Sequence, residues 1–282
     1  MWRARYAVRK ADSRAHLTAI WRYNARPPET VPKLMFRHLS VTAFGLCFCV
    51  VVLGAFVRLS DAGLGCPDWP GCYGHVGVPE ASHHVTAANA AFPERPVEVH
   101  KAWKEMIHRY AAGVLGLLIL GMSISSMVQR RGHKLPHVLV GLVLFQAVLG
   151  MWTVTLLLKP LVVTGHLIGG MTILSLLLLS VLRERDWMVS WPVPTTNHLQ
   201  HFAIAALLMV IVQVFLGAWT STNYAALACA DFPTCHGQIW PETDFEQGFV
   251  LWRGLGINYE GGVLDGPGRT AIHMAHRLGA LM

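Results

Sequence analysis

The chain has 282 residues, of which 53% are hydrophobic and only 14% charged, and this composition excludes an ordinary soluble domain. Its formal net charge of +7 is concentrated in residues 1–38, which hold nine Lys and Arg against Asp12 and Glu29. A basic segment before the first apolar run is typical of a cytoplasmic tail beside anionic lipid, so we expect a lipid bilayer as partner and no nucleic acid.

Five apolar runs follow that contain no Asp, Glu, Lys or Arg. Each is about 20 residues long, the length of helix that crosses a hydrocarbon layer of about 30 Å. The runs are 39–57, 110–128, 138–158, 160–182 and 202–222. A sixth span begins at "RTAIHMAHRLGALM" (269–282), where the chain stops short of a full crossing. The sequence therefore predicts an all-α integral membrane protein, and we expect it to continue for roughly two and a half more helices.

The charges of the connecting loops predict the orientation of these helices. The short loops "QRRGHK" (129–134) and "RERD" (183–186) are basic, which places them in the cytoplasm with the N-terminal tail. The long segments 59–104 and 223–268 then face outward. We expect a multi-pass protein of a bacterial inner (plasma) membrane with a cytoplasmic N-terminus. The alternative is the mitochondrial inner membrane, since the N-terminal segment is Arg-rich and acid-poor like a transit peptide.

An internal repeat relates the two parts of the chain. "GAFVRLSDAGLGCPDWPGC" from Gly54 aligns without a gap with "GAWTSTNYAALACADFPTC" from Gly217, and "EMIHRYAAGVLG" (105–116) pairs with "HMAHRLGAL" (273–281). A repeat of this length predicts two parallel four-helix units. The expected organisation is a basic tail (1–38), a first unit (39–182), a cytoplasmic linker (183–200) and an incomplete second unit (201–282).

Each outer loop carries two cysteines six residues apart with a proline between them. This spacing permits a small closed loop, and we expect the disulfides Cys66–Cys72 and Cys229–Cys235. Metal binding is the weaker alternative, because neither loop adds an obvious set of ligands.

Three histidines, His108, His166 and His276, lie within membrane segments, where ionisable side chains are rare and usually functional. The expected orientation places His108 and His166 in the outer half of the bilayer on helices of one bundle. Two imidazoles on facing helices favour axial ligation of a haem iron over a zinc or copper site. Glycines beside them would allow close approach of a flat macrocycle, although the same glycines would also serve simple helix packing.

Four charged residues near the outer boundary have open roles. Glu105 lies one helical turn from His108, and the second unit has His273 in its place. Its carboxylate is a candidate catalytic acid or base, or a helix-end carboxylate that interacts with the helix dipole. Arg58, Arg109 and Arg277 are candidate contacts of haem propionates, or cations that extend toward the interface.

These motifs together resemble the haem A synthase family. "GLGCPDWPGC", "EMIHR", "TGHLIGG" and "HMAHR" carry the resemblance, which covers about residues 38–282. It implies an eight-helix membrane oxidoreductase built from two four-helix halves. The family oxidises the C8 methyl of haem O to the formyl of haem A for insertion into cytochrome oxidase.

The resemblance also implies roles for particular residues. His108 and His166 would flank the substrate haem, Glu105 would be the reactive carboxylate, and Cys66 and Cys72 would be the outer-loop pair. His276 would be one ligand of a haem b, and the other would lie in the eighth helix, beyond this chain. The implied partners are haem O, the farnesyltransferase that produces it and the cytochrome oxidase assembly system, with a homo-oligomer left open.

Two other functions remain open at this point. A di-haem b-type electron-transfer cytochrome would explain the histidines and the bundle, but not Glu105 or its replacement by His273 in the second unit. A non-enzymatic assembly or haem-transport protein would use the long outer loops as partner surfaces.

Overall fold

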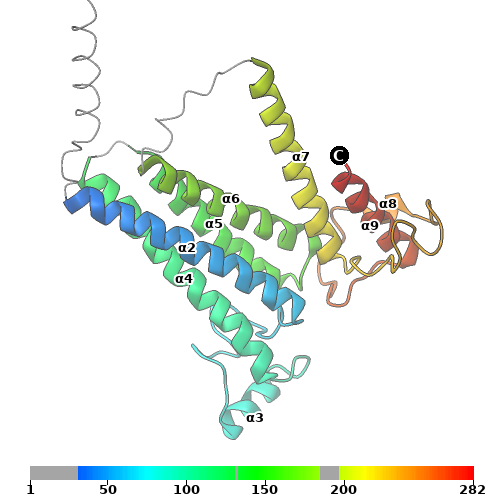
Figure 1. Cartoon of the computed structure of the whole chain (residues 1–282). Coiled ribbons are helices and arrows are strands. Elements are labelled where there is room, and N and C mark those ends of the chain that lie inside the picture. Colours follow the sequence, from blue (N-terminus) through cyan, green and yellow to red (C-terminus); the bar gives the residue numbers. More distant parts are fainter. Residues whose placement is uncertain (1–30, 131–132, 185–196) are drawn as a thin grey trace, which may run out of the picture.

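The computed structural model describes residues 31–130, 133–184 and 197–282 (Figure 1). Most of the predicted basic tail (1–38) and most of the predicted linker (183–200) lie outside these residues. Of the basic loop 129–134, residues 131–132 also lie outside them.

The described part of the chain is helical. Its five long helices are α2 (Val31–Leu59), α4 (Val99–Val128), α5 (Leu135–Thr155), α6 (Pro160–Glu184) and α7 (Asn197–Thr222). Within the described ranges, each of these five contains a segment long and apolar enough to cross a membrane. The predicted class, an all-α multi-pass membrane protein, is therefore confirmed.

Several helix ends differ from the predicted charge-free runs, among them one end of α4 and one of α5. Helix α4 begins at Val99 rather than at residue 110, because the helix continues past the charge-free run through Lys101, Lys104 and Glu105. Helix α5 ends at Thr155 rather than at residue 158. Leu157 and Leu158 instead take positive φ angles of 51° and 60° in the tight turn that leads into α6.

The first four long helices form a bundle in which α4 and α6 are diagonal. Helix α2 packs against α4 and α6, and α5 packs against the same two helices, whereas the described residues of α4 and α6 do not pack directly against each other. Apolar side chains fill the bundle, among them the buried Phe36, Ile119, Leu139 and Leu177. The two helices that carry His108 and His166 thus face each other across the bundle axis.

The remaining elements lie at one end of the bundle (Figure 1). Helix α7 packs against α6, and α9 (Gly266–Ala280) packs against α7 and against the short α8 (Phe245–Gly248). Asp265 caps α9 by accepting a hydrogen bond of 2.9 Å from the amide of Gly268. Another short helix, α3 (Ser82–Ala91), lies in the segment between α2 and α4, where the sequence predicted only a loop.

Candidate haem-binding site

Both predicted disulfides are present, one in each of the long segments 59–104 and 223–268. The S–S distance is 2.06 Å in Cys66–Cys72 and 2.09 Å in Cys229–Cys235. Metal binding by these cysteines is therefore not needed to explain them.

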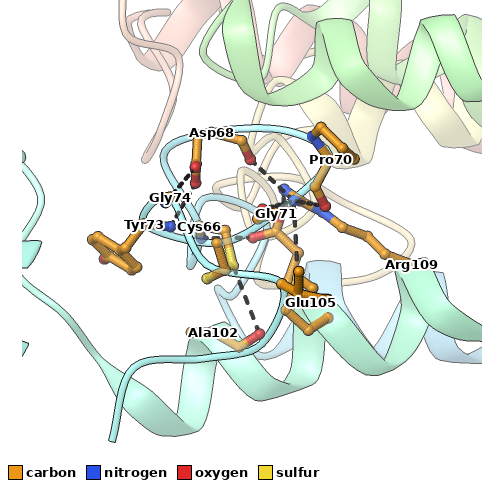
Figure 2. The surroundings of a disulfide bond; sticks show 12 residues. Cys66, Asp68, Pro70, Gly71, Tyr73, Gly74, Ala102, Glu105 and Arg109 are labelled. Atoms are coloured by element: carbon orange, nitrogen blue, oxygen red, sulfur yellow. Dashed lines mark hydrogen bonds and ion pairs between the residues drawn. A yellow bond between two sulfur atoms is a disulfide. The ribbon is translucent and has the colours of Figure 1, made fainter. Parts of the chain in front are cut away.

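The first disulfide loop is organised by Asp68. Its carboxylate accepts hydrogen bonds of 2.6 Å from the amide of Tyr73 and 2.7 Å from the amide of Gly74 (Figure 2). Tyr73 and Gly74 have positive φ angles of 54° and 77°, a conformation that turns successive N–H groups toward one carboxylate. An aspartate two residues after the first cysteine therefore fixes the shape of the loop.

The second disulfide loop has the same construction. Asp231 accepts hydrogen bonds of 2.7 Å from the amide of His236 and 3.0 Å from that of Gly237. The Thr234 hydroxyl, and after it the Gly237 amide, lower the pKa of Asp231 from 3.8 to about 2 because they stabilise the carboxylate. The two backbone-amide hydrogen bonds to the aspartate thus correspond in the two loops, whereas the Thr234 hydroxyl bond has no counterpart in the first loop, where Gly71 stands in its place.

An arginine attaches each loop to the helix that follows it. Arg109 of α4 donates from Nη1 to the carbonyl oxygens of Asp68 at 3.0 Å and Gly71 at 2.5 Å (Figure 2). Arg277 of α9 donates to the carbonyl oxygens of Thr234 at 2.9 Å and Cys229 at 3.2 Å. In this structure both guanidinium groups are engaged with loop carbonyls.

Glu105 joins the first loop to α4 from within the protein. Only 5% of this residue is exposed. Its Oε2 accepts a hydrogen bond of 2.9 Å from the amide of Cys66, and its Oε1 accepts one of 2.5 Å from Nη2 of Arg109 (Figure 2). Because one donor is charged and the site is buried, these bonds fix the carboxylate strongly.

The second unit replaces this carboxylate by an imidazole. Nδ1 of His273 lies 2.9 Å from the carbonyl oxygen of Ala225, in the turn that follows α7. Glu105 and His273 thus occupy corresponding positions, and each contacts the segment that follows a long helix: α2 in the first unit and α7 in the second. Only the first unit has a carboxylate there.

His108 and His166 each lie against a glycine of a neighbouring helix. A Cβ atom added at Gly54 of α2 would lie 3.0 Å from Cε1 of His108, and one at Gly150 of α5 would lie 3.3 Å from Cε1 of His166. The absence of a side chain at both glycines leaves space for the two rings.

The environment of these rings suits a haem with histidine ligands. Nδ1 of His108 and Nδ1 of His166 are buried and have no hydrogen-bond partner of normal geometry. Both rings are carried by diagonally placed helices, so a planar group between them would meet one imidazole on each face. Within the described residues, no three His, Cys, Asp or Glu side chains gather so that they could bind a metal ion by themselves.

His276 repeats this arrangement in the second unit. A Cβ atom at Gly217 of α7 would lie 3.1 Å from Cε1 of His276, just as one at Gly54 meets His108. Gly54 and Gly217 are the first residues of the aligned repeat segments, so this contact is a shared feature of both units.

Some contacts of the site were missed from the sequence. Gln146 and Gln213 contact the helical turns of His166 and His276, and each precedes a histidine-packing glycine by four residues. That shared spacing could have revealed them in the sequence. Alignment of the two units does not pair these glutamines, because Gln146 lies in α5, the third long helix of the first unit, and Gln213 lies in α7, the first long helix of the second. Arg58, a candidate propionate contact, instead donates a hydrogen bond of 2.6 Å to the carbonyl oxygen of Ser221.

Fold and site together define a helical membrane protein with histidines that lie against glycines of neighbouring helices. Residues 37–282 match the COX15-CtaA family, which is described as cytochrome oxidase assembly protein. The chain belongs to this family.

Curated relatives of the chain are bacterial haem A synthases. The protein of Shewanella oneidensis is 47% identical over 234 residues, which are 83% of this chain and 71% of that protein. That of Alkalihalophilus pseudofirmus is 26% identical over 208 residues (71% and 64%), and that of Shouchella clausii is 27% identical over 212 residues (72% and 64%). The chain thus spans less than two thirds of the latter two proteins.

The expected family is therefore confirmed, and with it a membrane oxidoreductase of the haem A synthase type. The relatives favour the enzymatic interpretation over an electron-carrying cytochrome and over a transport protein.

Proposed function

We propose that this chain binds haem O between His108 and His166 and acts in the oxidation of its C8 methyl group to the formyl group of haem A. The observation that carries the proposal is the placement of these histidines on diagonal helices, each beside a glycine of a neighbouring helix. The membership of the chain in a family of haem A synthases supports this substrate. The product would be passed to cytochrome oxidase assembly.

The iron porphyrin, when bound, supplies the redox chemistry of the reaction. The protein's contribution is to fix the plane and the rotation of the macrocycle and to place charge next to the reacting carbon. His108 and His166 would fix the plane, because each would bind the iron from one side.

Glu105 is the proposed catalytic residue. Conversion of a methyl to a formyl group, written with water as the oxygen source, is R–CH3 + H2O → R–CHO + 4 H+ + 4 e−. It needs an external electron acceptor and releases protons, so an acceptor for protons beside the methyl would accelerate it. Glu105 lies one turn from His108 on the same helix, and its carboxylate is held by Cys66 and Arg109. Uptake of a proton would weaken the ion pair with Arg109, so proton transfer and attachment of the disulfide loop are linked.

The second unit has a different proposed role. His276 would be a ligand of a haem b, and the replacement of the carboxylate by His273 is consistent with a site that carries electrons rather than reacts. Arg58, Arg109 and Arg277 remain candidate propionate contacts only if they exchange their present carbonyl partners. We propose a bacterial plasma membrane location and a haem O-producing farnesyltransferase as the supplier of substrate.

Co-expression with a source of haem O tests the reactive site. Glu105→Gln should retain bound haem, because His108 and His166 are intact, while the yield of haem A falls by about two to four orders of magnitude. His108→Ala should instead lose the bound haem O. The matched control is Glu98→Gln at the start of the same helix, where the side chain makes no capping hydrogen bond and pairs only with Lys101.

Haem content and haem A yield are measured together, by extraction of haem from the purified protein and from membranes. A normal haem A yield in Glu105→Gln with normal haem content would contradict the catalytic role. Retention of haem O by a variant that lacks both His108 and His166 would contradict the proposed binding site.

A further inference from the structure

Two helix pairs share a polar clamp next to the histidine. In the pair α5 and α6, the first helix carries Gln146 and, four residues later, Gly150, and the second carries His166 and, three residues later, Gly169. The pair α7 and α9 has the same four residue types at the same spacings: Gln213 and Gly217, then His276 and Gly279. The two pairs thus share one contact pattern.

Gln146 binds the helical turn that carries His166. Its Nε2 donates a hydrogen bond of 2.7 Å to the carbonyl oxygen of His166. A carbonyl oxygen only accepts, so this contact fixes which end of the amide faces α6. The amide also lies flat against Gly169, where an added Cβ atom would be 2.6 Å from Oε1 and 2.9 Å from Cδ of Gln146. Glycine at position 169 is therefore required for the glutamine to reach the histidine turn.

The second pair repeats this contact. Nε2 of Gln213 lies 3.1 Å from the carbonyl oxygen of His276 and 3.0 Å from its Nδ1. A Cβ atom at Gly279 would collide with Oε1 of Gln213. The segments that carry the two glutamines are similar in sequence, since "QAVLGMWTVT" (146–155) and "QVFLGAWTST" (213–222) share six of ten residues. The same glutamine, glycine and histidine contacts thus recur in two related helix pairs of one chain.

A clamp of this kind controls the position of the imidazole. In an apolar environment an amide that joins two helices opposes both sliding and rotation of one helix against the other, because movement would leave its donor unpaired. The donor contacts the backbone of the histidine itself. A Cβ atom added at Gly150 of the same helix α5 would lie 3.3 Å from Cε1 of His166, so this helix lies against both the backbone and the ring of the histidine.

The helix pair α2 and α4, which carries Gly54 and His108, holds its histidine turn by different contacts. Val50 occupies the position of the glutamine, four residues before Gly54, and Ala111 occupies the position three residues after His108. The polar anchors of this turn are instead Glu105 and Arg109, which flank His108 and bind the disulfide loop. The two histidines of the proposed haem O site are thus held in different ways: His108 by a reactive carboxylate and a loop, and His166 by an inert amide.

We propose that Gln146 is a positioning residue for His166, which holds this histidine at the height and rotation required of an axial haem ligand. The inference rests on the proposed function, since it assumes that His166 binds the iron. Gln146 itself would contact neither haem nor substrate. It acts through the backbone of His166, with Gly169 as the residue that gives it access.

The test compares Gln146→Met with Thr172→Val in the haem O-loaded protein. Methionine keeps the volume and the helical preference of glutamine but removes the donor. Thr172 is an exposed residue of α6, the helix that carries His166. Its hydroxyl donates to the carbonyl oxygen of Ile168 at 2.8 Å, so its substitution removes a polar group without touching the clamp.

Two properties of the bound haem are measured: the rate of haem O transfer to excess apomyoglobin, and the low-spin fraction of the ferric protein in its electron paramagnetic resonance spectrum. In Gln146→Met the transfer rate should rise about tenfold, the effect of losing one hydrogen bond, and the low-spin fraction should fall as His166 moves from the iron. Both properties should stay at wild-type values in Thr172→Val. If Gln146→Met accumulates poorly, Gly169→Ala displaces the same amide from the α6 side and should produce the same two changes.

Wild-type transfer rate and low-spin fraction in Gln146→Met would overturn the proposal, even if thermal stability falls, because that result assigns the glutamine to helix packing alone. Equal changes in Thr172→Val would overturn it as well. The haem O content of the wild-type protein separates the two levels of inference. A wild-type protein without bound haem O contradicts the proposed function and the clamp together, whereas a haem-loaded wild type with an indifferent Gln146→Met contradicts the clamp alone.

Discussion

Arg58 at the end of α2 donates a hydrogen bond of 2.6 Å to the carbonyl oxygen of Ser221, the residue 163 positions later that corresponds to Arg58 itself in the internal repeat. Its guanidinium group also lies 4.0 Å from the centroid of the Tyr224 ring. A contact between corresponding residues of two repeats is expected where a pseudo-two-fold axis passes between them. The side chain of Arg58 therefore joins the end of α2 to the end of α7, although within the described part of the chain the two helices do not pack directly against each other, and this contact is consistent with the pseudo-two-fold relation expected between the two units.

Further contacts join the units at the same end. Arg95 forms an ion pair of 3.3 Å with Glu260, which lies 165 positions later, close to the separation of the repeat. The hydroxyls of Thr164 and Thr222 lie 3.4 Å apart where α6 meets α7. Polar contacts at this end thus hold the second unit against the first.

Substitution of Arg58 tests this joint. Arg58→Ala removes both the hydrogen bond to Ser221 and the cation–π contact, and should lower the free energy of unfolding by about 2 kcal/mol. Arg58→Lys keeps the charge but not the planar group, so its thermal midpoint in detergent should lie between those of Arg58→Ala and the wild type. Haem content should not change, and its loss in both variants would instead support the propionate contact predicted from the sequence.

Lys159 provides a second joint between the units. It lies in the turn between α5 and α6, only 2% exposed, and its Nζ donates to the carbonyl oxygens of Arg253 at 2.6 Å and Gly254 at 3.0 Å. The same ammonium lies 3.4 Å from the centroid of the Trp252 ring. The turn of the first unit is thereby attached to the second outer loop.

Lys159→Met should detach that loop. The substitution keeps most of the volume but leaves two carbonyl oxygens without their donor, at a cost on the order of 2 kcal/mol. Proteolysis within residues 249–262 should become faster while the α2–α6 bundle stays intact. Lys134→Met, an exposed lysine at the opposite end of α5, is the matched control and should leave the cleavage rate unchanged. Equal cleavage of the two variants would argue against the joint.

The sequence predicted the five long helices because length and absence of charge are sufficient to identify a span in a bilayer. It did not predict their ends, since these depend on contacts outside the span. Leu157 and Leu158 are apolar like the helix before them, and only the tight reversal into Pro160 removes them from α5. Helix α3 was missed because its sequence lacks the apolar periodicity that would distinguish it from a loop.

In the candidate site too, some residues could be predicted from the sequence, whereas their partners could not. His108, His166 and His276 were identifiable because an ionisable side chain within a membrane segment is conspicuous. The partners of Arg109 and Arg277 were not, since an arginine next to a membrane boundary can bind any acceptor within its reach. Gln146 and Gln213 were overlooked because each is a single neutral polar residue in an apolar helix, and their role depends on a glycine of another helix.

Asp231 predicts how the second disulfide loop responds to acid. Its pKa is lowered from 3.8 to about 2, so the carboxylate stabilises the loop above pH about 4, and this contribution is lost as the pH falls through about 2. The amides of His236 and Gly237, which donate to this carboxylate, should be protected from hydrogen exchange at neutral pH. Asp231→Asn should remove that protection at neutral pH without affecting the Cys229–Cys235 disulfide. Equal protection in both proteins would show that the disulfide alone orders the loop.

Two glycines of α2 provide a matched pair that tests the packing of His108. A Cβ atom at Gly54 would lie 3.0 Å from Cε1 of His108, whereas one at Gly45 would meet nothing within 4 Å. Alanine favours a helix over glycine by about 1 kcal/mol, so Gly45→Ala should stabilise the protein. Gly54→Ala gains the same preference but crowds the imidazole, and overpacking costs about 1–3 kcal/mol, so it should be less stable than Gly45→Ala by about that amount.

Haem retention makes the comparison specific to the site. Because the crowded ring must shift by a few tenths of an ångström, Gly54→Ala should lose haem O faster than the wild type, and Gly45→Ala should retain it at the wild-type rate. Transfer of haem O to apomyoglobin from the two purified variants measures this difference. A pair of variants with equal transfer rates would show that Gly54 serves helix packing alone, and that the position of His108 does not depend on the space this glycine leaves.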